Sequence, residues 1–315
     1  MPVETKEKYF ESDIEAYLCS EEGGYLKATD NQSFLYIEDG TYQVLDGHGY
    51  SDMPGCGVDI KTLINYIQQT QPKAWERFEK QCASDVEKKF FKVFQDAVAR
   101  DGIIGVLKHG FKTRGIKFKV ISFMPESSLN DTSRENHRKN VCRCIRQFHF
   151  AAAGNQTVDM MLDVNGIPVI GIELKNQFTG QSIDDGMVQW QKRDVREACF
   201  KFNSRMVAYF AVDLYDVMMA TRLQGSDTRF LPFNQGSNGA GEDGGAGNPP
   251  SGDDGYPTEH LWMVALQKDS LLDILNKFLH LEVKEEVELD AHDNEKAVVK
   301  KRIIFPRYHQ LDVVR

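Results

Sequence analysis

The amino-acid sequence predicts an α/β fold, in which a central mixed β-sheet carries helices on both faces. Residues 157–175 contain two runs of β-forming residues on either side of Asn165-Gly166, a dipeptide typical of a tight hairpin turn. Residues 8–18 place apolar side chains at every fourth position, which predicts an amphipathic helix. The 315 residues are 41% hydrophobic and 27% charged, as in a globular protein with one large or two ordinary domains.

The other expected elements follow from spacing and from turn residues. Helical spacing runs from residue 58 to residue 100, and Gly102 is typical of a helix stop. Ser182 is a typical helix N-cap, and Asp184 and Asp185 in the first turn would complement the helix dipole. Eight glycines and four prolines predict an irregular surface loop at 231–260. We also expect strands at 103–107, 116–123, 205–212, 215–222 and 261–265, and a helix at 269–281.

The charge balance disfavours nucleic-acid binding by bulk attraction. The chain has 38 Lys and Arg against 47 Asp and Glu, a formal net charge of −9. Residues 101–150 reverse this balance, with ten basic and four acidic residues. This stretch either follows a phosphate backbone or forms ordinary solvated faces, and charge alone does not separate the two.

The sequence predicts a cytoplasmic protein without a membrane segment. It has no run of 18 apolar residues, and its N-terminus lacks the basic start and apolar core of a signal peptide. Six scattered cysteines fit reduced thiols better than a disulfide framework. Cys142 and Cys144 have no second cysteine pair that would complete a zinc site, so we expect no metal there.

Acidic and basic side chains on the expected hairpin form the strongest chemical signal. Because residues two apart share a face of a strand, Glu173 and Lys175 point the same way, as do Asp159 and Asp163. Two carboxylates suit a hard divalent cation such as Mg²⁺, which activates water and polarises a phosphate. A neighbouring ammonium group stabilises the charge that develops in the reaction. We take Asp159 and Glu173 as metal ligands, and Asp163 as an alternative ligand.

The hairpin register decides whether these groups meet. A two-residue turn would pair Val164 with Ile167 and would place Asp159 opposite Ile172, so that Glu173 would lie on the wrong face. A three-residue turn or a bulge restores a shared face. We therefore predict a bulge or a three-residue turn, with Asp159 opposite Gly171.

These residues and several further segments resemble the restriction (R) subunit of type I restriction–modification enzymes, within the PD-(D/E)xK nuclease superfamily. The matching segments are VDMMLDVNGIPVIGIELKN at 158–176, TGQSIDD at 179–185, FAVD at 210–213, TRLQGSDTRFLPFNQG at 221–236, GAGNP at 245–249, FESDIE at 10–15 and IIFPRYHQLDVVR at 303–315. The resemblance implies a restriction-endonuclease-like core within the α/β fold.

The resemblance also assigns roles to single residues. Asp159 and Glu173 would bind Mg²⁺, and Lys175 would be the catalytic lysine. Gln189 matches the glutamine of a Q-x-x-x-Y element on the following helix, but the tyrosine position holds Arg193. The remaining matches are Glu11 or Glu15, for an acid on the first helix that supports the site, and Gln310, for a glutamine that reads adenine in the parent enzyme.

The chain lacks the motif G-x-x-x-x-G-K-[ST], so we expect no P-loop ATPase within it. We expect residues 1–281 to form the nuclease domain. Residues 282–315 would be a charged boundary segment and the start of a missing helicase motor. The resemblance implies that ATP and S-adenosylmethionine act only in the holoenzyme, which contains methylation and specificity subunits.

The expected activity is Mg²⁺-dependent endonucleolytic cleavage of double-stranded DNA, without sequence specificity of its own. Two alternatives remain open from the sequence. The chain could be a non-catalytic assembly module that docks the motor to a methyltransferase core. It could also be a RecB-like exonuclease module that acts on DNA ends.

Overall fold

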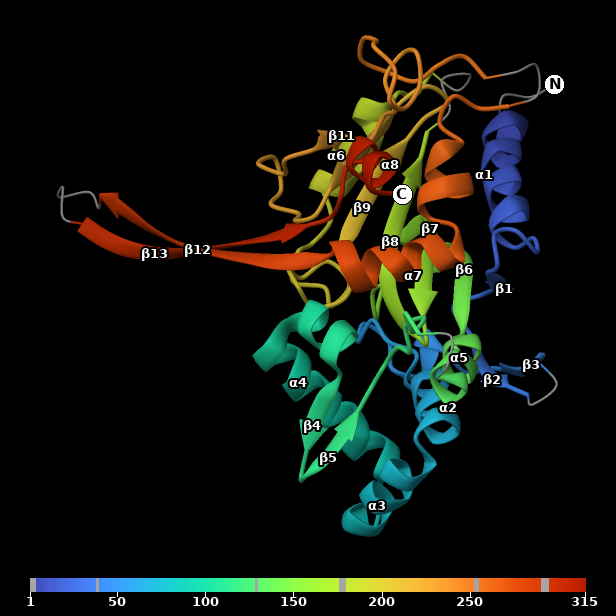
Figure 1. The fold of residues 1–315 in the computed structure, drawn as a ribbon, viewed down its shortest axis with the longest axis vertical. Coiled ribbons are helices and arrows are strands. Elements are labelled where there is room, and N and C mark those ends of the chain that lie inside the picture. The colour runs from blue at the N-terminus through green and yellow to red at the C-terminus, as the bar shows by residue number, and fades with distance from the viewer. Residues whose placement is uncertain (1–3, 38–39, 128–129, 176–179, 252–254, 290–294) are drawn as a thin grey trace.

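A central seven-stranded sheet organises the molecule (Figure 1). The computed structural model describes residues 4–37, 40–127, 130–175, 180–251, 255–289 and 295–315. The strands, in spatial order, are β1 (Leu26–Ala28), β6 (Cys142–His149), β7 (Thr157–Val164), β8 (Ile167–Leu174), β9 (Ala208–Val212), β10 (Val217–Ala220) and β11 (Leu231–Pro232). The β1–β6 and β8–β9 pairs are parallel and the other pairs are antiparallel, which confirms the predicted mixed sheet.

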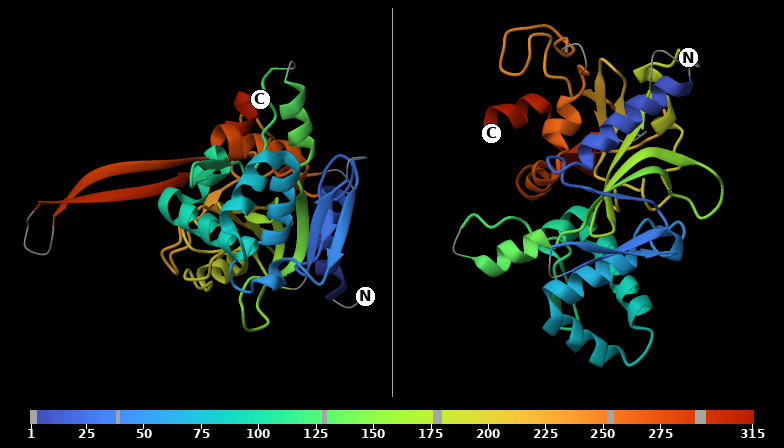
Figure 2. Two further views of the ribbon diagram at one scale, coloured as in Figure 1. Left: turned by 90° about the horizontal axis from the view of Figure 1, so that it is seen from below. Right: turned by 90° about the vertical axis from the view of Figure 1, so that its right-hand side faces the viewer.

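Helices cover both faces of this sheet, as predicted (Figures 1 and 2). On one face, α6 (Ile183–Gln191) buries Trp190 against Tyr209 and Ala211 of β9. On the other face, α1 (Glu4–Leu18) buries Phe10 and Ile14 in a core cluster that also contains Met160 of β7. The sheet therefore separates two apolar layers, and β7 contributes Met160 and Leu162 to one layer and Val158 and Met161 to the other.

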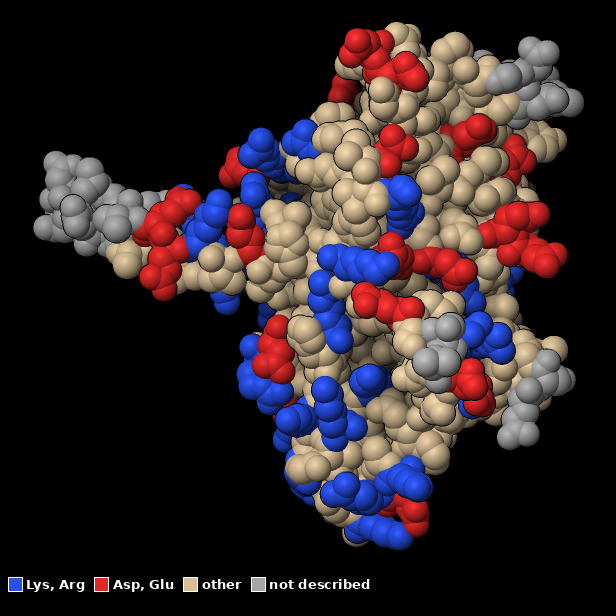
Figure 3. Space-filling view, viewed as in Figure 1, with Lys and Arg blue, Asp and Glu red and all other residues tan. Residues whose placement is uncertain are grey.

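A helical layer packs beside the sheet and contains α2 (Ile60–Thr70), α3 (Pro72–Cys82), α4 (Val86–His109) and the short pair β4 (Phe111–Thr113) and β5 (Ile116–Phe118). The strand predicted at 103–107 is wrong, because these residues continue α4 beyond a kink at Gly102. A short buried apolar run does not distinguish a strand from a helix by periodicity. Figure 3 shows Lys and Arg atoms gathered over this layer and at the base of a protruding hairpin.

Smaller elements complete the N-terminal half. They are β2 (Gln32–Tyr36), β3 (Tyr42–Asp46), the 3₁₀ turn Tyr50–Asp52 and α5 (Asp131–Arg138). Asp59 caps α2, since its carboxylate accepts a hydrogen bond from the Thr62 backbone N–H at 3.0 Å. The same carboxylate also forms a buried ion pair with Arg143.

The C-terminal part differs from the sequence expectation in two places. Residues Leu261–Ala265, predicted as a strand, form a π-helical turn that buries Leu261 and Trp262. The predicted helix at 269–281 is found as α7 (Lys268–Asp273) and a further π-helical turn, Ile274–Phe278. Of the described residues in 231–260, only β11 forms a strand, which confirms the predicted irregular loop.

A long hairpin, β12 (His280–Leu289) and β13 (Glu295–Ile304), extends away from the body and is followed by α8 (Tyr308–Val314) (Figures 1 and 2). This hairpin was not predicted from the sequence, in which half of the residues of both strands are charged. Cross-strand ion pairs accommodate those charges, as between Glu282 and Arg302, which are 3.0 Å apart.

Candidate functional site

The β7–β8 hairpin contains both a tight turn and a bulge. Val164 pairs with Ile167 across Asn165-Gly166, and both turn residues have positive φ, 53° and 82°. This geometry is typical of a two-residue type I′ turn, so the predicted three-residue turn is wrong. The register then shifts between Leu162 and Asp163, which confirms the predicted bulge.

The bulge lies on β8 and shifts the register in the direction opposite to the predicted one. Leu162 pairs with Ile170 and Met160 pairs with Ile172, so Val169 is the additional residue. Continuing this register places Asp159 opposite Glu173 rather than Gly171. The Asp159 carboxylate accepts a hydrogen bond of 2.8 Å from the Leu174 backbone N–H, which fixes it at the end of β8.

Lys175 completes the group that the sequence predicted. Its backbone N–H extends the β8–β9 ladder by donating to the Val212 carbonyl at 2.8 Å. Its Nζ lies 3.7 Å from Asp159 Oδ2, and its side chain is 8% exposed. Gly186 of α6 packs beside this stem: a Cβ at Gly186 would lie 3.4 Å from Lys175 Cγ and 3.1 Å from the Ala211 Cβ of β9.

Glu173 is the most perturbed member of the group. Its side chain is fully buried, one carboxylate oxygen accepts a hydrogen bond from Arg193, and the other has no partner among the described residues. Burial, and then the nearby Asp159 carboxylate, raise the pKa of Glu173 to about 8, against the opposing effect of Arg193. A buried carboxylate with an open oxygen beside a second carboxylate is a typical cation site.

Arg193 contacts Glu173, a contact that the sequence did not predict. The same guanidinium nitrogen, Nη2, also donates to the Thr157 carbonyl at 2.5 Å, and the guanidinium lies 4.9 Å from the centre of the Phe150 ring. Arg193 follows α6 and occupies the tyrosine position of the Q-x-x-x-Y element. Spacing could not reveal the contact, because it depends on how α6 packs against β8.

Gln189 lies on α6, one helical turn before Arg193, and is half-buried. Within the part of the chain that the structure describes, its side chain forms no hydrogen bond. The predicted cap of this helix is confirmed, since the Asp185 carboxylate accepts from the Ser182 backbone N–H at 2.8 Å in a capping box.

Among the described residues, the hydrogen bonds and ion pairs of Glu11 and Glu15 do not involve Asp159, Glu173 or Lys175. Both carboxylates bind Arg146, at 2.7 Å and 3.3 Å, and Glu15 also binds Lys27 at 2.7 Å. Gln147, the neighbour of Arg146 on β6, also donates a hydrogen bond to Glu11 at 3.4 Å. These acids hold α1 to the sheet.

Asp163, the alternative ligand, belongs to a buried charged cluster in which its carboxylate is bonded to other residues. Its carboxylate accepts hydrogen bonds from Arg143 and from the Tyr50 hydroxyl, the latter at 2.7 Å. Arg143 also binds Asp59 at 2.8 Å, and all three charged side chains are fully buried. The Asp163 side chain is thus committed to internal partners.

The other predicted positions lie elsewhere. Gln310 caps α8, where its side-chain oxygen accepts from the Arg307 backbone N–H at 2.9 Å. Cys142 and Cys144 are buried free thiols. The basic stretch is divided: Arg143 and Arg146 serve internal ion pairs, whereas Lys112, Lys117 and Lys119 are exposed on the helical layer.

The site suits a hard cation that keeps part of its water shell. In the described ranges, no group of three or more His, Cys, Asp or Glu side chains is arranged to hold a metal. Two carboxylates are enough for Mg²⁺, which usually retains several waters and binds through one or two carboxylates. The unpartnered oxygen of Glu173, beside Asp159, therefore fits such a cation.

A mixed sheet with an acidic pair and a lysine at the end of one hairpin defines an α/β fold consistent with a restriction-endonuclease-like core. The family model of the type I restriction enzyme R protein N terminus matches residues 39–231, more than half of the chain, and the chain belongs to this family. No curated protein matches it. None of the described helices is long and apolar enough to cross a membrane.

The matched region contains Asp159, Glu173, Lys175 and Gln189. It excludes Glu11, Glu15 and Gln310, as well as the β12–β13 hairpin. The family match and the clustered groups therefore coincide on the same part of the sheet.

Proposed function

We propose that this chain is the Mg²⁺-dependent endonuclease domain of a type I restriction enzyme R subunit and cleaves double-stranded DNA. One observation carries the proposal. Asp159 accepts a hydrogen bond of 2.8 Å from the N–H of Leu174, the neighbour of Glu173, and Lys175 Nζ lies 3.7 Å from Asp159 Oδ2, in a chain of this family.

Each residue has a role that its environment supports. Asp159 and Glu173 would hold the cation through their carboxylates, and Arg193 orients Glu173 as a positioning residue. Lys175, held against Gly186, would donate to the phosphate or orient the attacking water. A bound Mg²⁺ supplies a polarised phosphate and a more acidic water.

The parent complex would supply what this chain lacks. By its family, the chain would act with methylation and specificity subunits, and ATP and S-adenosylmethionine would serve the holoenzyme. We also place the protein in the cytoplasm, in agreement with its six free cysteines.

The decisive experiment measures Mg²⁺-dependent nicking of covalently closed circular DNA by the complete complex. Asp159→Ala, Glu173→Ala and Lys175→Ala should each lower nicking at least ~100-fold while ATP hydrolysis continues. Lys192→Ala, a change of an exposed lysine on the same helical segment, is the matched control and should cut normally.

Three results would contradict the proposal. Normal nicking by Lys175→Ala would reject the assigned site. Cutting of linear but not of closed circular DNA would identify an exonuclease. Complex assembly that depends on this chain, with unchanged nicking in all three variants, would identify an assembly module.

A further inference from the structure

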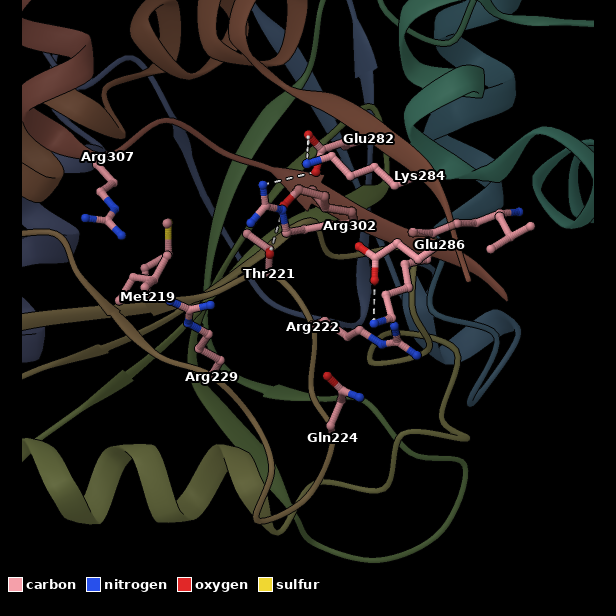
Figure 4. A pocket seen from close by; sticks show the side chains of 15 residues that line it. Met219, Thr221, Arg222, Gln224, Arg229, Glu282, Lys284, Glu286, Arg302 and Arg307 are labelled. Atoms are coloured by element: carbon pink, nitrogen blue, oxygen red, sulfur yellow. Dashed lines mark hydrogen bonds and ion pairs between the residues drawn. The ribbon is translucent and has the colours of Figure 1, made fainter. Parts of the chain in front are cut away.

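A basic cavity lies away from the proposed cleavage site. It has a volume of about 580 Å³ and opens between the β10–β11 connection and the base of the β12–β13 hairpin (Figure 4). Seven of its 15 lining residues are Lys or Arg and two are Glu, a local charge of +5 in a chain of net charge −9. We call this cavity the hairpin groove.

The two glutamates of the hairpin groove are already neutralised. Glu282 binds Arg302 at 3.0 Å and Lys284 at 3.4 Å, and Glu286 binds Lys300 at 2.7 Å. These pairs appear as dashed lines in Figure 4.

Four further cations line the groove and have no carboxylate partner among the described residues. They are Arg222, Arg229, Lys301 and Arg307, of which the first three are exposed. Three of the four are arginines, whose planar guanidinium matches phosphate oxygens in a bidentate arrangement. Their charge is available to an anionic partner.

The loop that carries two of these arginines has a defined conformation. Thr228 accepts a hydrogen bond from the Gln224 N–H at 2.8 Å and donates to the Gly225 carbonyl at 2.7 Å. Thr221 donates to the Ile303 carbonyl at 3.0 Å, which ties the loop to the hairpin. Arg222 lies 4.7 Å from the centre of the Phe202 ring. The groove is therefore built by contacts between the sheet edge and the hairpin.

The hairpin groove and the cleavage site are separate. Met219, which lines the groove, pairs with Phe210 and shares its face, opposite the face of Ala211 and Glu173. The groove also follows the end of β10 that lies away from Lys175. Lys301 lines a neighbouring cavity of about 570 Å³ that contains Lys201 as well, so the basic surface extends beyond the groove.

We propose that the hairpin groove binds the phosphate backbone of double-stranded DNA and is a second DNA contact of this chain. The inference rests on the proposed function in taking DNA as the partner, but it does not depend on cleavage. Unpaired arginines and lysine along an open groove are the pattern that neutralises successive phosphates.

The test measures binding of a fluorescent DNA duplex to the 315-residue chain in EDTA at low salt. Arg222→Gln, Arg229→Gln and Lys301→Gln are combined in one variant. The matched control combines Lys112→Gln, Lys117→Gln and Lys119→Gln, which removes the same charge from an exposed surface elsewhere. Circular dichroism confirms that both variants are folded.

We expect the groove variant to bind at least ~10-fold more weakly, with the slope of log K against log salt reduced by about three. The control should lose less than about threefold. Equal losses in the two variants would show a bulk charge effect and overturn the proposal, as would unchanged binding by the groove variant.

Photocrosslinking locates the contact without altering charge. A benzoylphenylalanine at Gln224, in the groove, should crosslink to the duplex, whereas one at Val44, on β3, should not. A crosslink from Val44 alone would contradict the proposal.

Since binding is measured without metal, a chain that binds through the groove but does not cut would reject only the cleavage proposal. A chain that cuts but binds independently of the groove would reject only this one.

Discussion

Asp159 and Asp163 lie on the same strand and share a face, yet their surroundings differ completely. Asp163 is fully buried and has bonds to Arg143 and Tyr50, whereas the Asp159 side chain is 20% exposed and has Lys175 at 3.7 Å. Beside Asp159, Glu173 has an oxygen without a partner. We call the cluster of Asp163 closed, because its carboxylates are bonded to internal partners. We call the cluster of Asp159 and Glu173 open, because a carboxylate oxygen of Glu173 can still accept a ligand.

The difference shows that carboxylates alone do not identify a site. The closed cluster contains two acids and one base, and the open cluster contains two acids with Lys175 and Arg193 beside them. The distinguishing feature is the balance between hydrogen-bond capacity and available partners. The closed cluster satisfies its acids internally, and the open one does not.

The largest expected effect separates the two clusters by stability. Arg143→Met leaves Asp59 and Asp163 buried without a cation and should destabilise the chain by about 3–5 kcal/mol. Lys175→Met, the same kind of change in the open cluster, should cost less than ~1 kcal/mol. Urea unfolding measures both, and similar losses in the two variants would remove the distinction.

A second prediction concerns pH in metal-free buffer. Because the folded pKa of Glu173 is raised to about 8 from an ordinary value of 4.5, folding favours the protonated form. This contribution is complete below about pH 4.5 and is lost as the pH rises through 8, a difference of a few kcal/mol. Glu173→Gln should remove most of this decline in stability with pH, because an amide does not titrate in this range. Its amide oxygen can still accept the hydrogen bond from Arg193.

The measurement is the free energy of unfolding in EDTA between pH 5 and pH 9, where the other groups of the chain titrate equally in both proteins. A parallel decline in wild type and Glu173→Gln would show that another group causes it.

The smallest effect concerns the acids of α1. Glu11→Gln and Glu15→Gln should leave nicking within about twofold of wild type, because the hydrogen bonds and ion pairs of both acids go to Arg146 and other residues outside the proposed site. Stability should fall by no more than about 1 kcal/mol for either change. Loss of nicking on the scale expected for Glu173→Ala would place α1 in the site.

Local pattern was sufficient for much of the fold and for part of the candidate site. Period-two alternation predicted that Glu173 and Lys175 share a face, and Asn165-Gly166 predicted a hairpin, because both depend on residues close in sequence. The need for a bulge also followed from counting residues across the turn. The position of the bulge at Val169 of β8 did not follow, because counting from the turn alone does not fix which strand carries the additional residue.

Contacts between distant segments lay beyond such patterns. Lys112 and Arg143 belong to one basic stretch, yet one is exposed and the other is fully buried between two aspartates. The β12–β13 hairpin was missed because half of the residues in its strands are charged. Ion pairs such as Glu282–Arg302 join the two strands.

The residue order alone thus determined that a hairpin forms at Asn165-Gly166, that Glu173 and Lys175 lie two positions apart, and which chemical groups are available, since these features arise within a few residues of one another. Only the tertiary structure decided which charged side chains would be paired with an internal partner. Arg193 reaches Glu173 and Arg143 reaches Asp163 through packing of separate elements. An unpaired charge costs free energy when it is buried. The tertiary arrangement therefore determines which carboxylates have all their oxygens bonded to internal partners and which keep an oxygen without a partner.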